Sequence, residues 1–510
     1  MKYLWYYKKV HKVSFSWGHK MFDITEPLHP GATTADGERI SLQKQLKERI
    51  RHAILSGFLP PEKELLSSRA LSKELGISRN TVVNVYDQLA AEGYILADRQ
   101  GTRVAALSGS DRVIAPALKL HMSDVKLAER LRPFVDNARS LTADALLSPG
   151  MPALREFPLS AWRRSLDRAA RQLLPSSLGY AEPIGERTLR EALAMHLFIA
   201  RGVRCEASSI IITEGARQAL ELCVNLLTDP GDTVWMEDPG YYGARAAFNA
   251  GKLRTVMMAV DEDGMRVPDE AWQTPIPKLI YTSPAHQYPT GAVLSVSRRL
   301  ALISEAEKTG AWIIEDDYDG DFRHSGSPIS CMQGLLENAP VLYIGSFSKT
   351  MFPSLRIGFV VLPASIIEQA GNILNEVLRN GQHLQQLALA DFMKSGEFGR
   401  HLGRMRRLYR ERQRILRDAL TENFAHDQIL GGKSGIHLTL RLAPGTDDKR
   451  VAELARQRGL GVQALSSYCE STGSASGLVI GYGNTYSEDI PAAVNVLTSL
   501  IKLVNGDKVY

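Results

Sequence analysis

The spacing of apolar residues divides the chain into a short helical part near the N-terminus and a longer part in which strands and helices alternate. In the first part, apolar side chains recur three and four positions apart, which is the period of an amphipathic helix. Helices are predicted over 42–55, over 67–75 and, from the good capping residue Ser78, to about residue 92. Gly76 turns the chain before the last of them.

The third predicted helix is amphipathic, with its apolar residues on one face and its polar residues on the other. Two short β-type runs, 94–97 and 102–105, lie on either side of Gly101 and predict a hairpin. Helix, turn, capped helix and hairpin together form the pattern of a winged helix-turn-helix. In such domains the N-terminal residues of the last helix contact bases. Here these residues are Arg79, Asn80 and Thr81.

From about residue 146 onward, short apolar runs alternate with amphipathic helices. The runs bounded by turns or charges are 209–213, 233–235, 279–281, 312–314 and 341–344. This alternation predicts an α/β domain with a mostly parallel sheet, covered by helices on both faces. Ligands of such sheets bind at the carboxyl ends of the strands, so the residues after each run are the candidates for chemistry.

The two patterned parts give the expected domain boundaries. Residues 38–105 form the winged helix, 146–505 form the α/β domain, and 106–145 are expected to be a linker because they have no sustained periodicity. Residues 1–37 are expected to be a disordered extension. Lysines interrupt its aromatic residues, which excludes the apolar segment of a signal peptide, whereas contact with DNA phosphates stays open.

Composition narrows the class of protein. The 510 residues, 44% hydrophobic and 23% charged, are typical of a water-soluble globular protein with more than one domain. The net charge of +5 permits a nucleic-acid partner without requiring one. The four cysteines lie far apart and lack metal-ligand spacing, so we expect no metal site and a reducing, cytoplasmic location. The chain has no apolar run long enough for a transmembrane helix, and no membrane association is expected.

The first two runs end in residues that suit a flat, phosphorylated ligand. Gly215, Ala216 and Arg217 open a helix after the first run, where backbone N–H groups and the helix dipole favour a phosphate. Tyr241 follows the second run and can stack on a heterocyclic ring. Either feature alone is weak, because glycine turns and surface tyrosines are common.

The last two runs end in residues that suit the reactive groups of such a ligand. Asp316 and Tyr318 share one face of the strand, where an acid can pair with a protonated ring nitrogen and a tyrosine with a phenolic oxygen. Lys349 follows the last run, and a desolvated lysine there can form a Schiff base with an aldehyde. The residues suited to bind phosphate beside it are Ser346, Ser348 and Arg356.

The N-terminal part resembles the winged helix of GntR-family transcription factors. The resemblance rests on the stretches 65–71, 75–82 and 86–94, with Leu66 in place of the usual proline. It implies that Arg69 and Ser78 meet the DNA backbone or the groove edge and that Arg79 and Thr81 meet the site itself. It also implies a wing contact at Gly101 and Thr102. A three-helix protein-interaction module is the alternative interpretation.

The order glycine turn, aromatic, acid, lysine resembles that of fold-type-I pyridoxal-phosphate (PLP) enzymes related to aspartate aminotransferase. By this resemblance Lys349 is the residue that attaches the cofactor, and Tyr180 reaches the phosphate in the neighbouring subunit. Tyr288 stands where these enzymes place the asparagine that bonds the phenolic oxygen of PLP. The residues that could replace this asparagine are His286 and Gln287.

A GntR-like winged helix fused to an aminotransferase-like domain resembles the MocR/GabR family of PLP-dependent transcriptional regulators. The resemblance implies promoter binding, a homodimer, and sensing of PLP, alone or with an amine or amino acid. The alternative is a working aminotransferase that carries a DNA-binding module. Two departures favour the regulator: Tyr288, and the stretch 478–483, which lacks the arginine that binds substrate carboxylates in aminotransferases.

Overall fold

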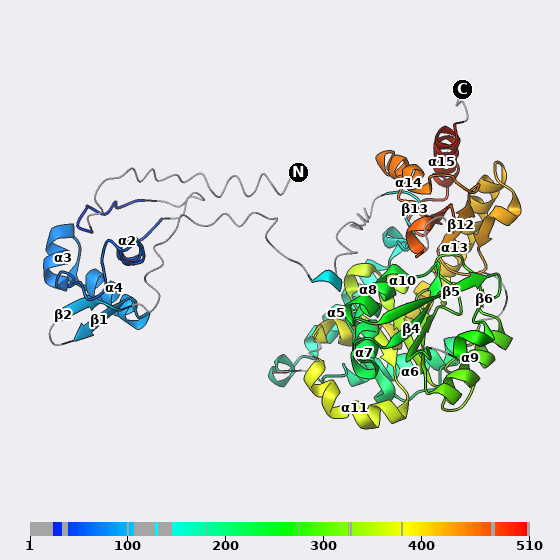
Figure 1. The fold of residues 1–510 in the computed structure, drawn as a ribbon, viewed down its shortest axis with the longest axis horizontal. Coiled ribbons are helices and arrows are strands. Elements are labelled where there is room, and N and C mark those ends of the chain that lie inside the picture. The colour runs from blue at the N-terminus through cyan, green and yellow to red at the C-terminus, as the bar shows by residue number, and fades with distance from the viewer. Residues whose placement is uncertain are drawn as a thin grey trace. The chain divides into compact units, whose positions relative to one another are not determined.

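The computed structural model describes the chain in two compact units, Met1–Lys126 and Leu127–Tyr510 (Figure 1). The described residues are 24–32, 39–98, 101–106, 128–130, 145–180, 182–273, 275–324, 326, 329–378, 381–470 and 475–506. Most of the predicted extension and linker lies outside these residues.

The first unit is the predicted winged helix. Its elements are α2 (Leu42–Leu55), α3 (Ser68–Leu75), α4 (Arg79–Ala91), β1 (Ile95–Asp98) and β2 (Gly101–Val104). Serine side chains cap all three helices, and Gly76 ends α3 in the left-handed conformation at φ 63°. The apolar stripes of the helices and the inner residues of the hairpin form one core. The strands are antiparallel, with Ile95 opposite Val104 and Asp98 opposite Gly101.

Part of the predicted N-terminal extension packs on this unit. Leu28 is buried in the winged-helix core. The backbone N–H of His29 donates to the side-chain amide of Gln45 at 3.2 Å, and that amide donates back to the His29 carbonyl at 3.1 Å. The expectation of disorder throughout 1–37 was therefore wrong for residues 24–32, because an isolated leucine produces no periodic signal.

The second unit contains an eight-stranded sheet in the order β3-β10-β9-β8-β7-β4-β5-β6. The strands are β3 (Ile210–Thr213), β4 (Thr233–Asp238), β5 (Arg254–Asp261), β6 (Gly264–Met265), β7 (Leu279–Thr282), β8 (Trp312–Asp317), β9 (Val341–Ser346) and β10 (Gly358–Val361). The five predicted strands are present as β3, β4, β7, β8 and β9. Parallel pairing joins β5, β4, β7, β8 and β9 in this order. The strand β10 lies between β3 and β9 and is antiparallel to both.

Helices cover both faces of this sheet, as predicted. Alternate strand residues face opposite sides: Ile211 packs in a core with α7 (Ala216–Leu227) and α8 (Tyr242–Ala250), whereas Ile210 and Ile212 pack with α6 (Arg187–Arg201) and α12 (His383–Lys394). The helix α9 (Val296–Thr309) forms a further core with Ile280 and Ile313. Further helices of this unit are α5 (Leu159–Arg171), α10 (Phe347–Thr350), α11 (Ala364–Val377) and α13 (Glu397–Thr421).

A smaller antiparallel sheet near the C-terminus, which the sequence did not predict, completes the unit. Its order is β11-β12-β14-β13. The elements are β11 (Ile429–Gly431), β12 (His437–Arg441), β13 (Gln463–Ala464) and β14 (Gly477–Gly481), with helices α14 (Asp448–Gln457) and α15 (Ile490–Val504). His437 begins β12 and Gln463 begins β13, and both side chains line a cavity at the strand ends of the larger sheet. Within the described residues, we find no helix that is both long enough and apolar enough to cross a membrane.

Candidate functional site

A cavity of about 410 Å³ lies where the strands β3, β4, β8 and β9 end. It brings together most of the residues predicted at these strand ends. Its walls are formed by Pro149, Gly150, Gly215, Ala216, Arg217, Tyr241, Tyr281, Tyr288, Asp316, Tyr318, Ser346, Ser348, Lys349, Arg356, Ile436, His437, Gln463 and Tyr468. The position agrees with the rule that ligands of α/β sheets bind at the carboxyl ends of the strands.

Lys349 lies on the short helix α10, directly after β9. Its Nζ donates to the carbonyl oxygen of Gly150 at 2.5 Å. A Cβ at position 150 would lie 3.0 Å from this Nζ, so glycine allows the close approach. Burial lowers the pKa of Lys349, while Asp319 and Asp316 act in the opposite direction. A desolvated amine of this kind is a good nucleophile toward a carbonyl carbon.

Asp316 lies in β8 with its carboxyl fully buried in the cavity wall. Its Oδ2 accepts a hydrogen bond from the Tyr281 hydroxyl at 2.6 Å, whereas Oδ1 has no hydrogen-bond partner among the described residues. Burial raises the pKa of Asp316 to about 7. An unmatched carboxylate oxygen in such a place is costly unless an N–H group or a cation binds it. The site therefore fits a ligand that presents a protonated ring nitrogen.

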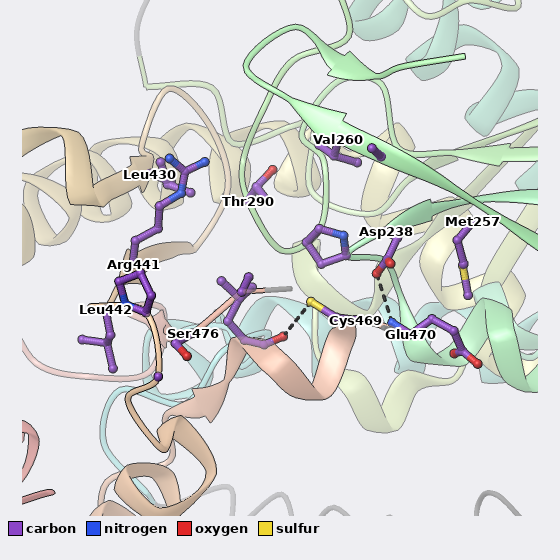
Figure 2. A pocket seen from close by; sticks show the side chains of 16 residues that line it. Asp238, Met257, Val260, Thr290, Leu430, Arg441, Leu442, Cys469, Glu470 and Ser476 are labelled. Atoms are coloured by element: carbon purple, nitrogen blue, oxygen red, sulfur yellow. Dashed lines mark hydrogen bonds between the residues drawn. The ribbon is translucent and has the colours of Figure 1, made fainter. Parts of the chain in front are cut away.

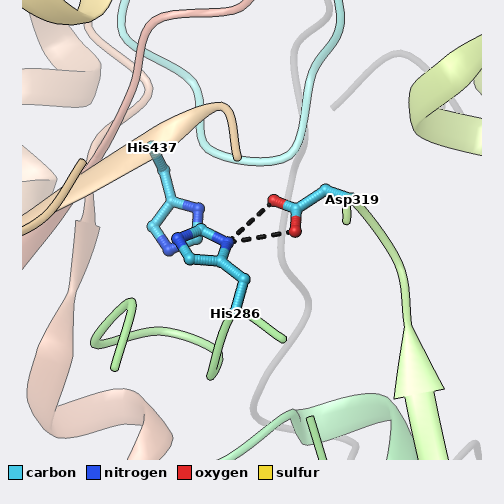
Figure 3. A group of neighbouring side chains, drawn as sticks. All are labelled: His286, Asp319 and His437. Carbon is cyan, nitrogen blue, oxygen red and sulfur yellow. Dashed lines mark hydrogen bonds and ion pairs between the residues drawn. The ribbon is translucent and has the colours of Figure 1, made fainter. Parts of the chain in front are cut away.

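Figure 3 shows a buried pair in which His286 faces the Asp319 carboxylate. The Tyr318 hydroxyl contacts this pair. It lies 2.9 Å from His286 Nδ1, and the same nitrogen lies 3.0 Å from each carboxylate oxygen of Asp319. When Nδ1 carries a proton, it donates to the Asp319 carboxylate and cannot accept from Tyr318, which leaves the Tyr318 O–H free to donate into the cavity.

His286, Asp319 and His437 could each offer an atom to a metal, because these atoms lie within 4.8 Å of one another. Both histidines have other contacts, however. His286 Nδ1 bonds Asp319 and Tyr318, and His437 Nε2 lies 3.0 Å from the Pro289 carbonyl. Burial lowers the pKa of His437 to about 3, so its ring is neutral at ordinary pH. We interpret the group as a hydrogen-bonded support for Tyr318.

Backbone amides, hydroxyls and an arginine converge at one end of the cavity. Gly215 precedes the N-terminus of α7 at φ 101°, and a Cβ there would lie 3.7 Å from the Arg356 guanidinium. The Ser346 hydroxyl donates to the Ser348 hydroxyl at 2.9 Å. A helix N-terminus with free N–H groups beside an arginine and two hydroxyls is suited to bind a phosphate.

Aromatic rings form another part of the wall. The Tyr241 and Tyr288 rings pack edge to face with centroids 6.2 Å apart. The Tyr288 hydroxyl lies 2.9 Å from the Tyr468 hydroxyl, and Tyr468 donates to the Gln463 side chain. The ring of Tyr288 also packs against His437, with centroids 5.1 Å apart.

Three of the predicted cofactor-binding residues do not line this cavity. His286 lies behind Tyr318. Gln287 is buried elsewhere, with its amide nitrogen 2.7 Å from the Pro239 carbonyl and 3.2 Å from the Glu237 carboxylate. Tyr180 is fully exposed on the surface of this chain. Local hydrogen bonds hold the side chains of His286 and Gln287 outside the lining of this cavity.

A wider pocket of about 760 Å³ lies between β5 and the small sheet (Figure 2). Its walls include Asp238, Arg441, Cys469 and Glu470. The Asp238 carboxylate accepts from the Glu470 backbone N–H at 3.1 Å, and the Cys469 thiol contacts the Leu465 carbonyl at 3.7 Å. It lacks the combination of buried amine, buried acid and phosphate-binding groups found around Lys349.

On the winged helix, the predicted DNA-contacting residues lie at the start of α4, on α3 and in the hairpin. Arg69, Arg79 and Asn80 are exposed. The Ser78 hydroxyl caps α4 by accepting from the Thr81 N–H at 3.1 Å and lies 2.8 Å from the Thr81 hydroxyl. Gly101 and Thr102 begin β2, where the hairpin reverses. The Tyr86 hydroxyl donates to the Leu66 carbonyl at 2.8 Å and fixes α4 against the chain that leads into α3.

Comparison with known proteins identifies the two units. Residues 42–104 match the family "Bacterial regulatory proteins, gntR family", and residues 146–476 match "Aminotransferase class I and II". The probable rhizopine catabolism regulatory protein MocR of Rhizobium meliloti is 34% identical over 471 residues, which cover 90% of this chain and 94% of that protein. The chain belongs to the MocR family of transcriptional regulators.

Another MocR-type relative has a more specific name. The HTH-type pyridoxine biosynthesis transcriptional regulator PdxR of Corynebacterium glutamicum is 35% identical over 456 residues, covering 89% of this chain and 94% of that protein. The two family matches confirm the expected combination of a GntR winged helix and a fold-type-I aminotransferase domain.

Solved aminotransferases share the fold of the large MocR domain. A kynurenine aminotransferase from Pyrococcus horikoshii, in complex with PMP, has 25% identity and a TM-score of 0.66, covering 74% of this chain and 95% of that one. The α-aminoadipate aminotransferase LysN of Thermus thermophilus, complexed with N-(5'-phosphopyridoxyl)-L-leucine, has 25% identity and a TM-score of 0.65, covering 74% and 96%.

Several residues of this MocR-type cavity escaped the sequence analysis. Tyr281 belongs to a predicted strand, but nothing in the sequence indicates that its hydroxyl bonds Asp316. Gly150, His437, Gln463 and Tyr468 come from segments far from the strand ends in sequence. The predicted order of strand ends gives no information about such segments, since their positions depend on how the small sheet folds back onto the larger one.

Proposed function

We propose that this protein is a PLP-dependent transcriptional regulator in which the winged helix binds promoter DNA and the large domain senses PLP, alone or with an amine or amino acid. The observation that carries the proposal is the pairing, in one cavity, of buried Lys349 with buried Asp316, whose Oδ1 has no partner among the described residues. PLP, when bound, supplies an aldehyde for the lysine amine and a ring nitrogen for this oxygen.

The other cavity residues would hold the remaining parts of the cofactor. Ser346, Ser348, Arg356 and the amides of Gly215, Ala216 and Arg217 would bind the phosphate. Tyr318 would donate to the phenolic oxygen, with His286 and Asp319 fixing its orientation. Tyr241 would pack against the ring. Asp316 would keep the ring nitrogen protonated, because a carboxylate beside it stabilises the cation.

We further propose that the protein acts as a homodimer in the cytoplasm. Met195, Phe198 and Ile199 lie on one face of α6 and are 69%, 65% and 76% exposed, and an apolar face of this kind commonly marks an interface. Exposed Tyr180 would then reach the phosphate site of the partner subunit.

For DNA, we propose that Arg79, Asn80 and Thr81 contact base edges at the start of α4. Arg69 and Ser78 would contact the backbone or the groove edge, and Gly101 and Thr102 would form the contact of the wing. Ser78, Arg79, Asn80 and Thr81 lie at the capped start of the recognition helix α4. Arg69 lies on α3, and Gly101 and Thr102 lie in the hairpin. Winged helices bind DNA from these elements.

The alternative function is transamination by an aminotransferase that carries a DNA-binding domain. Tyr288 lines the cavity where the related enzymes use asparagine, and the strand β14 (Gly477–Gly481) contains no arginine for a substrate carboxylate. Both departures favour sensing over turnover.

The absorbance spectrum of the purified protein tests the cofactor. We expect a yellow protein, or one that turns yellow with added PLP, and borohydride reduction followed by peptide mapping should find the label on Lys349. Lys349→Ala should lose the covalent attachment, whereas the exposed Lys433→Ala should keep it. A colourless wild type that takes up no added PLP would contradict the proposal.

A further inference from the structure

The part of the cavity that remains after the cofactor residues are assigned is neutral and polar. Its wall is formed by Gly150, Tyr288, Ile436, His437, Gln463 and Tyr468. Most of these residues come from the small sheet and the loops around it, and the Gly150 carbonyl accepts a hydrogen bond from Lys349 Nζ. A second ligand whose nitrogen lies beside Lys349 would contact these residues with its other end.

Hydroxyl and amide groups form a continuous chain along this wall. The Tyr288 and Tyr468 hydroxyls are 2.9 Å apart, and Tyr468 donates to Gln463 Oε1. A hydroxyl both donates and accepts, so a ligand hydroxyl can join this chain in either direction. A carboxylate can only accept, and it brings a full negative charge that the chain does not neutralise.

The described residues of this chain place no cation on this wall. Two arginines line the cavity. The Arg356 guanidinium lies beside Gly215, and Arg217 belongs to the first turn of α7, which begins after Gly215. His437 is neutral because burial lowers its pKa to about 3. Arg245, four residues after Tyr241, contacts the Glu470 carboxylate at 2.5 Å and is not part of the wall.

We propose that the effector is a primary amine whose other end is uncharged and carries a hydroxyl, such as an amino alcohol, and is not an amino acid. This inference rests on the proposed function. The amine nitrogen lies beside Lys349, and the hydroxyl joins the chain formed by Tyr288, Tyr468 and Gln463. An amino acid would bury its carboxylate among these neutral groups without a charge partner, which is strongly unfavourable.

Matched ligand pairs test the proposal directly. The full-length protein is loaded with PLP, and its absorbance is recorded before any amine is added. Calorimetric titrations then compare L-alaninol with L-alanine, and 4-aminobutanol with 4-aminobutanoate, because each pair differs only in a hydroxymethyl group against a carboxylate. The amino alcohol should bind about tenfold more tightly or better in at least one pair, since an unpaired buried polar group costs roughly 5- to 150-fold in affinity and a charged group costs more.

Two cavity variants and a control locate the effect. Tyr468→Phe should weaken the amino alcohol by about tenfold, the loss expected for one hydrogen bond. Gln463→Arg should place a cation on the wall and reverse the preference toward the amino acid of the pair. Tyr242→Phe, which removes a tyrosine hydroxyl outside the cavity wall, should leave both affinities unchanged.

These outcomes distinguish a failure of the proposed PLP-dependent function from a failure of the effector inference. A protein that takes up no PLP contradicts the proposed function and this inference with it. A yellow protein in which neither amino alcohol binds more tightly than its matching amino acid contradicts the inference alone. The wild-type titrations decide this without reference to the variants, so a variant that fails to fold does not affect the test.

Discussion

Asp316 is the cavity residue whose protonation depends most directly on what binds beside it. Its carboxyl is buried and accepts one hydrogen bond from Tyr281, and Asp317, Glu237 and Asp319 add negative charge around it. Without a cationic ligand, these surroundings favour the protonated acid. With a protonated ring nitrogen against Oδ1, they favour the carboxylate.

This gives a prediction about the cofactor-free protein. Burial raises the pKa of Asp316 from 3.8 to about 7, so the folded protein holds a proton that the unfolded chain has already released. The stability that this proton gives is present below about pH 4 and is lost as the pH rises toward 7. Asp316→Asn removes the titration and keeps an acceptor for Tyr281. At pH 8 the variant should be more stable than the wild type by on the order of 2–4 kcal/mol, with little difference near pH 4.

Thermal melting at the two pH values measures this difference. Glu315 has a pKa raised to about 7 by burial and titrates in the same window, so the wild-type slope should be reduced in the variant but not abolished. Added PLP provides the control, because it should stabilise the wild type more than the variant at pH 8. Identical pH profiles for the two apoproteins would show that Asp316 is already ionised in the folded state.

At the level of single residues, the sequence predicted the groups that follow a strand directly. Asp316, Tyr318 and Lys349 were found because parallel strands end at one edge of a sheet, so sequence order becomes spatial proximity. His437 and Tyr468 could not be found in this way. Their place in the cavity depends on how the small sheet packs against the larger one. The residues that make these contacts lie more than a hundred positions apart in the sequence.

Among the elements, the helices and the parallel strands could be predicted because their signals are local. Ser78 caps α4, Gly76 ends α3, and the apolar stripes of α2 and α4 repeat with the helical period. The strand β10 (Gly358–Val361) was missed because it follows the Arg356 turn without a separate signal. It is specified by its pairing with β3, whose residues lie far upstream in the sequence.

The recognition helix α4 supports a prediction about DNA. If Arg79 reads a guanine edge, Arg79→Ala should cost about 1–3 kcal/mol on the operator and relax the preference at one base position. If Arg69 contacts a phosphate, Arg69→Ala should weaken binding to all sequences alike and reduce the salt slope by roughly one.

Fluorescence anisotropy with operator and random DNA, at several salt concentrations, measures both effects. Arg51→Ala is a suitable control, because Arg51 lies on α2 and pairs with Glu48 at 2.5 Å. Equal losses on operator and random DNA for Arg79→Ala would assign this residue to the backbone and leave base reading to other side chains.

On the scale of the whole molecule, the two units must be energetically coupled if the protein is a sensor. A sensor has two states that bind the operator with different affinities. A ligand in the cavity can change DNA binding only when it binds one of these states more tightly than the other. Typical coupling free energies of about 1–3 kcal/mol would change operator affinity by roughly 5- to 150-fold. Linkage requires that operator DNA change the affinity for the ligand by the same factor.

This reciprocity is the last prediction, and it distinguishes a sensor from an enzyme. Operator affinity is measured for the apoprotein, for the protein with PLP, and with PLP plus an amine that binds in calorimetry. The amine is then titrated with and without operator, and the two ratios should agree. Lys349→Ala serves as the control, because its operator affinity should not respond to the amine. Unchanged operator affinity in all three states, together with rapid formation of a carbonyl product from the amine, would identify the large domain as an aminotransferase whose catalysis is independent of the DNA-binding domain.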